Sequence, residues 1–134
     1  MILFDTSVII DARDADSPFH AWAKQRIAEA VVGDGASANT VVVSEVSVQA
    51  RNRDAVPGLL ESFGMTLVPL PVSAAVPAAK AFALYLDRLK KEGKRTENRV
   101  PLPDFLIGAH AQAERLTPLR GFDPSAENLF DASH

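Results

Sequence analysis

Three carboxylates at distant points of the chain are the residues whose type and surroundings could carry chemistry. Asp5 follows the apolar run MILF, Glu45 lies between valines in VVVSEVSV, and Asp104 precedes the apolar stretch FLIGAHA. An ionised carboxylate beside apolar residues is costly unless it is paired or bound to a cation. Each also has an ordinary alternative role. Asp5 and Asp104 could cap helices, and Glu45 could lie on the solvent-facing side of an amphipathic helix.

Together the three acids predict oxygen ligands brought from separate elements, without a histidine or cysteine beside them. This ligand set suits Mg²⁺ or Mn²⁺ rather than zinc. Without a cation such carboxylates raise one another's pKa, whereas a bound divalent ion favours the charged forms and can activate water for attack on a phosphodiester. Gly108 and Ala111 lie on about the same helical face as Asp104, which leaves room for a metal and a phosphate.

Elements that could position these acids follow from the pattern of apolar residues. We expect strands at MILF, at MTLVPL and, more weakly, at LTPL, with a short helix at DAVPGLLESFG. The segment ASANTVVVSEVSVQARNR is ambiguous. Its valines favour a strand, whereas Val42, Val46 and Ala50 have the spacing of a helix face.

Capping residues and prolines predict the limits of the longer helices. Ser17, followed by Pro18, is expected to cap a helix that stops at Gly33. Ser73 is expected to cap a long helix with Pro77 in its first turn. A third helix, DFLIGAHAQAERL, is expected to have Asp104 at or near its N-cap. Strands alternating with helices predict an α/β sandwich with a largely parallel sheet, in which ligands bind at the carboxyl ends of the strands.

Composition limits the classes of protein that the chain can belong to. Its 134 residues predict a single domain over 1–134. The lack of cysteine excludes disulfides, thiolate zinc sites and cysteine nucleophiles, and it fits a reducing cytoplasm. The N-terminus has no basic leader and carries Asp5 within its apolar run, so we expect neither a signal peptide nor a membrane span there.

Charge is distributed unevenly along the chain. The net charge is −3, which argues mildly against a protein that coats nucleic acid nonspecifically. Between positions 80 and 99, however, seven basic residues stand against three acidic ones. This basic segment could meet phosphates, or it could be a solvated helix end and loop. His20 and His110 are expected to be packed or solvated helix residues.

Three segments resemble, in order, the motifs of the PIN-domain ribonucleases, and in particular the VapC-type toxins of bacterial type II toxin–antitoxin systems. MILFDTSVIID is similar to the family's opening strand with its Asp-Thr-Asn/Ser motif, and ANTVVVSEVSV to its second motif around a glutamate. VPLPDFLIGAHAQAE resembles the family's Pro-Asp helix most closely. The resemblance extends from residue 1 to about residue 122 and implies a three-layer α/β/α PIN-like fold.

By this resemblance Asp5 and Asp104 would hold Mg²⁺ or Mn²⁺, Glu45 would complete the acidic cluster, and Ser7 would support it. The implied reaction is endonucleolytic hydrolysis of RNA by metal-activated water. Implied partners are the RNA substrate, a second copy in a homodimer, and a cognate antitoxin whose C-terminal segment would block the acidic cleft. The basic segment and the scattered arginines are then candidates for substrate contact: Arg13, Arg51 and Arg53.

The stretch LTPLRGFDP departs from the family pattern, in which a Leu-Thr-Arg-Asp stretch supplies a fourth acid. If Thr117 matches the family's threonine, then Pro118 and Leu119 stand where arginine and aspartate are expected. If Arg120 matches the family's arginine instead, the stretch is shortened. Asp123 is the nearby carboxylate in either alignment, and it is either a turn residue or a loose substitute for the fourth acid.

Several functions therefore stay open. Three acids suffice for catalysis, or the protein is a catalytically weakened PIN protein that acts mainly by binding its antitoxin. A housekeeping RNA-processing PIN nuclease is a further alternative. A response-regulator receiver, which is also α/β with acids at strand ends, fits poorly, because TLVPLP has no phospho-accepting aspartate and no lysine follows Lys94.

Overall fold

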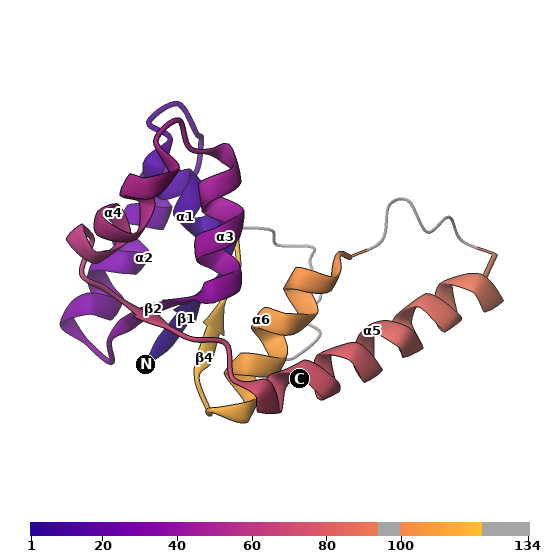
Figure 1. Ribbon diagram of the computed structural model, residues 1–134. Helices are drawn as coiled ribbons and strands as arrows, with labels where there is room; N and C mark the ends of the chain where they lie inside the picture. Colours follow the sequence, from indigo (N-terminus) through magenta and orange to yellow (C-terminus); the bar gives the residue numbers. More distant parts are fainter. Residues whose placement is uncertain (94–99, 122–134) are drawn as a thin grey trace.

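The computed structural model describes residues 1–93 and 100–121, and it alternates short strands with helices (Figure 1). In chain order the elements are β1 (Ile2–Phe4), α1 (Thr6–Arg13), α2 (His20–Val32), β2 (Ala36–Asn39), α3 (Thr40–Gln49), the 3₁₀ helix η1 (Arg53–Ala55), α4 (Val56–Ser62), β3 (Met65–Val68), α5 (Val72–Lys91), α6 (Leu102–Ala113) and β4 (Thr117–Leu119).

The four strands form one parallel sheet in the order β3-β2-β1-β4. Leu3 of β1 pairs with Ser37 on one side and with Pro118 on the other. Pro118 lacks an N–H donor, which an edge strand such as β4 tolerates. Because every strand runs the same way, the residues that follow β1, β2 and β4 emerge at the same edge of the sheet. This edge is where α/β proteins place their ligands.

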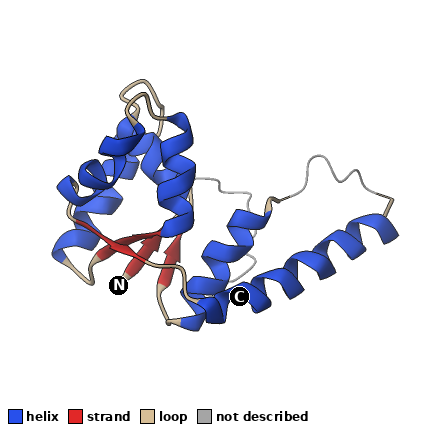
Figure 2. Ribbon diagram, in the orientation of Figure 1, coloured by secondary structure: helices blue, strands red, loops and turns tan. Residues whose placement is uncertain are grey.

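Helices flank the sheet on both sides in the α/β/α arrangement that the resemblance predicts (Figure 2). Side chains from several layers meet in the main apolar core: Leu3 and Phe4 of β1, Ile9 of α1, Val42 of α3 and Leu60 of α4 are all fully buried. Burial of residues of this size stabilises a fold by roughly 1.5–3 kcal/mol per side chain. The core thus fixes the positions of β1 and α1, the two elements on either side of Asp5.

Helices α5 and α6 pack against each other around a smaller cluster and extend to one side of the sheet (Figure 1). Phe105 is buried at its centre. The Phe105 ring lies with its centroid 5.4 Å from that of Phe82 and 5.5 Å from that of Tyr85. Such aromatic pairs add about 0.5–1.5 kcal/mol beyond their buried area. This packing holds the first turn of α6, which carries Asp104.

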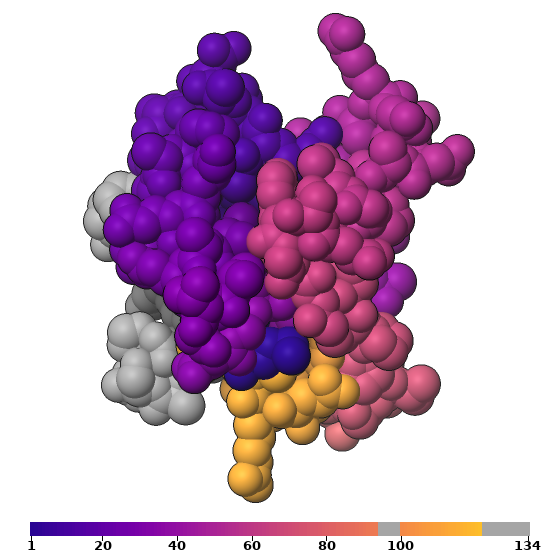
Figure 3. Space-filling model, turned by 90° about the vertical axis from the view of Figure 1, so that its left-hand side faces the viewer, coloured from indigo at the N-terminus to yellow at the C-terminus, as the bar shows by residue number. Residues whose placement is uncertain are grey.

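Figure 3 turns another face toward the viewer, on which the first part of the chain and the segment that follows α3 lie side by side. A small, largely apolar hollow of about 180 Å³ lies on the α2 side of the molecule. Ile27 and Ala28 of α2 line it together with Ala12 and Phe63. Within the described ranges, no helix is both long and apolar enough to cross a membrane.

The ambiguous segment after Gly35 proves to be a strand followed by a helix. β2 has no apolar run of the usual kind, since its sequence is ASAN, but all its residues are buried because it lies between β1 and β3. The sequence prediction of three strands therefore missed β2. The helical spacing of Val42 and Val46 is confirmed, because both lie on the buried face of α3.

Two predicted helix caps are wrong. α2 begins at His20 with Phe19 as its N-cap, while Ser17 accepts a hydrogen bond from the Phe19 amide and donates one to Asp11. Ser17 therefore stabilises the turn that precedes α2. α5 begins at Val72, directly after the extended Pro71, and it has no side-chain cap.

Ser73 therefore lies within the first turn of α5, and Pro77 lies in the second turn rather than the first. A proline there cannot donate the helical hydrogen bond to the Ser73 carbonyl. Pro77 is exposed, so water can reach the backbone at this point. Part of the predicted polar loop after α5 lies outside the described residues.

Candidate active site

Asp5 stands where β1 ends and α1 begins. Its extended backbone makes it the N-cap of α1, and its Oδ1 atom accepts hydrogen bonds from the Val8 amide at 3.3 Å and from the Ser7 hydroxyl at 2.7 Å. The ordinary capping role is therefore present. It does not exclude chemistry, because the same carboxylate also lines a groove at the carboxyl edge of the sheet.

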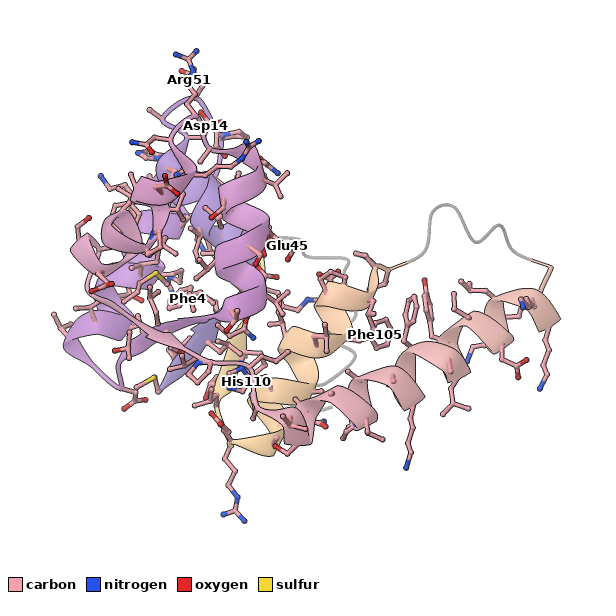
Figure 4. All side chains as sticks on the ribbon, in the orientation of Figure 1. Phe4, Asp14, Glu45, Arg51, Phe105 and His110 are labelled. Atoms are coloured by element: carbon pink, nitrogen blue, oxygen red, sulfur yellow. The ribbon has the colours of Figure 1, made fainter. Side chains whose placement is uncertain are left out.

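Glu45 lies on α3, half-buried and on the side that faces α6 (Figure 4). Its Oε1 atom accepts a hydrogen bond of 2.6 Å from the Thr6 hydroxyl. Glu45 is thus only partly exposed, and its carboxylate bonds to a residue far away in the sequence, which a plain solvated helix face would not require. Thr6, which directly follows Asp5, was not singled out in the sequence. The hydrogen bond fixes Glu45 relative to the Asp5 end of the groove.

Asp104 is the third residue of α6 and lies in its first turn. The helix begins at Leu102 because Pro103 fits the first turn, where its missing N–H has no helical partner to serve. Pro101 is the N-cap, so Asp104 is near the cap but not at it. A negative charge in the first turn is favoured by the helix dipole.

The three predicted acids meet in one groove with a volume of about 510 Å³. Its other lining residues come mostly from α1 and from the segment after β4: Thr6, Ser7, Ile10, Asp11, Phe19, Arg120 and Gly121. Asp5 and Asp104 also line a narrower hollow together with Gly108 and Leu119. The small Gly108 therefore lies beside the acids, as predicted, whereas Ala111 packs in the core.

The charges in this groove act on one another. Burial raises the pKa of the Asp5 carboxyl, and hydrogen bonds from Ser7, Val8 and the Gly121 amide, together with the charge of Arg120, offset only part of that effect.

For Asp104, burial is the largest cause of a raised pKa, the charges of Asp5 and Glu45 raise it further, and Arg120 lowers it. Asp104 thus lies close enough to Asp5 and to Glu45 to be repelled by both. Positive charge in the groove would relieve this repulsion.

Arg120 and Gly121 are site residues that sequence reasoning missed. β4 pairs in parallel with β1, and the Asp5 amide donates to the Leu119 carbonyl at 3.0 Å, so the chain after β4 reaches the groove beside Asp5. A Cβ atom on Gly121 would collide with the Ser7 hydroxyl. The prediction of LTPL as a strand could have identified them. Residues that follow parallel strands emerge at the same edge of the sheet, so the residues after LTPL are expected near Asp5.

The fourth acid of the family pattern is absent from the end of β4. Leu119 stands there, paired with Phe4, and it lines the narrow hollow with Asp5 and Asp104. Position 119 therefore lies beside the acids but carries an apolar side chain. Asp123 lies outside the described residues.

The arginines suggested as substrate contacts do not line the groove. Arg53 donates to the carbonyls of Ser47 and Val48 and so caps the C-terminal end of α3. Arg51 lies at the top of Figure 4, beyond the C-terminal end of α3 and away from Glu45. Arg13 is in the last turn of α1, at the opposite end of that helix from Asp5. Of the described basic residues, Arg120 is the one that lines the groove.

The donor set fits a hard divalent cation, although the carboxylates do not enclose one. In the described part of the chain, no three acidic or histidine side chains converge closely enough to form a complete metal cluster. Mg²⁺ does not need one, because it keeps several waters and binds through one or two carboxylates. Asp5 and Asp104, which line both hollows, would hold it, with Glu45 nearby.

A buried hydrogen-bond network connects the helices that carry Glu45 and Asp104. His110 of α6 is fully buried, with Nδ1 3.0 Å from the Asn39 amide nitrogen and Nε2 2.9 Å from a Glu114 oxygen. Asn39 caps α3 through its Oδ1 atom, which accepts from the Val42 amide at 3.0 Å. His110 is therefore a helix residue, as predicted, and of the two alternatives left open it is the packed one.

Comparison with known proteins gives the same fold. A family model described as "PIN domain" matches residues 2–129. VapC20 of Mycobacterium tuberculosis, described as a sarcin–ricin loop cleaving toxin, superposes with a TM-score of 0.68 at 15% identity over 93% of this chain and 92% of that one.

VapBC2 of Rickettsia felis, solved bound to a promoter DNA fragment, gives a TM-score of 0.60 at 14% identity over 88% of this chain and 85% of that one. FitAcB of Neisseria gonorrhoeae gives 0.59 at 19% identity with the same coverage of 88% and 85%. No curated protein matches the chain in sequence. At these identities the structural likenesses establish the fold.

Proposed function

The chain belongs to the PIN domain family, and from this premise we propose that it is a metal-dependent endoribonuclease and the toxin of a toxin–antitoxin pair. The observation that carries the proposal is the groove in which Asp5, directly after β1, meets Glu45 of α3 and Asp104 of α6. The structural likeness to proteins described as VapC toxins supports the toxin assignment.

In this proposal Asp5 and Asp104 are the ligands of Mg²⁺ or Mn²⁺, and Glu45 completes the acidic cluster. The bound ion would supply charge stabilisation and activate water for attack on an RNA phosphodiester. Ser7 orients Asp5 through its hydroxyl, and Thr6 orients Glu45 in the same way. These two hydroxyls therefore hold the acids in place before substrate arrives.

The proposed partners follow from the same comparison. Two of the similar structures are complexes named VapBC2 and FitAcB, and this supports a cognate antitoxin as partner. We propose that this antitoxin covers the acidic groove. We also propose that residues 1–134 act as a single PIN-like domain, that two copies form a homodimer, and that the protein acts on RNA in the cytoplasm.

The test is cleavage of a panel of structured RNAs with and without Mn²⁺, including a sarcin–ricin loop hairpin because VapC20 is described as cleaving that loop. We expect Mn²⁺-dependent internal cuts by the wild-type protein. The Asp5→Asn variant should lose at least about a hundredfold in rate, because an amide is a poor ligand for a hard cation and the site loses a charge.

Asp5→Asn is a matched control, because asparagine caps a helix as well as aspartate does and α1 should stay folded. Equal background cleavage by the wild type and by Asp5→Asn would contradict the nuclease proposal. It would leave the catalytically weakened alternative, which the apolar Leu119 beside the acids favours. Growth arrest on expression, relieved by a neighbouring small open reading frame, would distinguish a toxin from a housekeeping nuclease.

A further inference from the structure

Arg120 brings positive charge to the edge of the sheet where the acids lie. It directly follows β4, whose last carbonyl, on Leu119, accepts the Asp5 amide at 3.0 Å. Arg120 lines the acidic groove and also the narrower hollow, and Asp5 and Asp104 line both of these spaces with it. Its side chain is half-buried, so water screens its charge only in part.

The electrostatics of the groove agree with this placement. The charge of Arg120 lowers the pKa of Asp5 and of Asp104. It opposes the effect of burial at both carboxyls and, at Asp104, also the repulsion from Asp5 and Glu45. Leu119, the preceding residue, adds no negative charge. Among the described residues, Asp5, Asp104 and Arg120 are the charged residues that line both the groove and the narrower hollow.

We propose that the Arg120 guanidinium is an internal counter-ion of Asp5 and Asp104 and competes with a divalent cation for these two carboxylates. The inference rests on the proposed function in one respect, the binding of a divalent ion by Asp5 and Asp104. A fixed positive charge beside the ligands opposes the entry of a second cation. In the metal-free protein the same charge stabilises the fold by reducing carboxylate repulsion.

Removal of the Arg120 charge should therefore weaken the metal-free fold but strengthen metal binding. An arginine with a purely structural role would produce only the first effect. In the full-length, metal-free protein, Arg120→Gln should lower the melting temperature. The same variant should bind Mn²⁺ about tenfold more tightly, because removal of a positive charge beside the ligands lowers the electrostatic cost of bringing in a cation. Addition of Mn²⁺ should then raise the melting temperature of Arg120→Gln more than that of the wild type.

Calorimetric titration with MnCl₂ and thermal unfolding with and without MnCl₂ measure these quantities. Arg120→Lys keeps the charge and should stay close to wild-type affinity. Lys90→Gln on α5 is the matched control, because it removes the same charge from a residue outside the groove and should leave Mn²⁺ affinity unchanged. If Arg120→Gln does not fold, Arg120→Met keeps the apolar stem without the charge and should show the same tighter binding.

Mn²⁺ binding by the neutral variants that is equal to or weaker than that of the wild type would overturn the proposed competition. The following outcomes separate failure of this competition from failure of the metal-dependent function. If the wild type binds Mn²⁺, Asp104→Asn does not, and Arg120→Gln binds as the wild type does, only the competition is wrong. If neither the wild type nor Arg120→Gln binds Mn²⁺, the metal-dependent function falls as well.

Discussion

Asp104 gives the clearest residue-scale consequence of the groove. Burial and the charges of Asp5 and Glu45 raise its pKa in the folded protein above the ordinary value of 3.8. The folded state then binds the proton more tightly than the unfolded state does, so stability is greatest below the ordinary pKa. It decreases as the pH rises through the raised value. At neutral pH the ionised Asp104 therefore destabilises the metal-free protein.

We expect Asp104→Asn to stabilise the metal-free protein at pH 7. The gain should be small, about 0.5 kcal/mol, because water screens a half-exposed carboxylate. Urea unfolding in EDTA at several pH values measures it, and the gain should shrink toward pH 4. Asp16→Asn, at an exposed position outside the groove, is the control and should change little. A less stable Asp104→Asn at pH 7 would contradict the electrostatic account.

At the scale of elements, the site depends on how α3 and α6 are held together. Asn39 ends β2, caps α3 and meets His110 of α6, so one buried amide connects three elements. Because the Asn39 oxygen accepts from Val42, its nitrogen is the donor to His110 Nδ1. The Nε2 atom then carries the hydrogen and donates to Glu114. The network fixes the relative position of the helices that bear Glu45 and Asp104.

His110→Leu should therefore destabilise the protein by about 1–3 kcal/mol, because the buried Asn39 amide loses its acceptor. Chemical denaturation measures this loss. Glu114→Gln is the comparison, because Glu114 is 46% exposed, its replacement still accepts a hydrogen bond, and the loss should stay below about 1 kcal/mol. Similar small losses for the two variants would show that the network does not hold the helices.

At the scale of the whole molecule, α5 carries an exposed apolar stripe on one helix face, formed by Val72, Val76, Ala79 and Ala83. Val72 and Val76 are 88% and 58% exposed. Contiguous exposed apolar residues commonly mark an interface. The homodimer proposed for this protein is the occupant that we assign to the stripe, since a second copy presents the same apolar surface in a symmetric contact.

Val76→Glu should then shift the protein from dimer to monomer, because a carboxylate would lose its hydration in an apolar contact. Light scattering coupled to size-exclusion chromatography measures the mass. Val32→Glu is the control, because Val32 is 87% exposed but lies on α2, outside the stripe. A wild-type monomer, or equal dimerisation by Val76→Glu and Val32→Glu, would exclude this use of α5.

The sequence by itself determined what local patterns encode. The apolar run before Asp5, the spacing of Val42 and Val46, and the prolines at the start of α6 predicted the elements that carry the three acids of the groove. The motif order predicted the family, which the match over residues 2–129 confirms. These signals are local because helix periodicity and capping act over a few neighbouring residues.

Tertiary structure decided what depends on contacts between distant segments. ASAN became β2 only because β1 and β3 enclose it, and Ser17 and Ser73 failed as caps because neighbouring turns and Pro71 set the helix starts. Pairing of β4 with β1 brought Arg120 beside Asp5 and left the apolar Leu119 next to the acids. No local pattern carries such information, because parallel strands that pair are joined by long connections and meet only in the folded sheet.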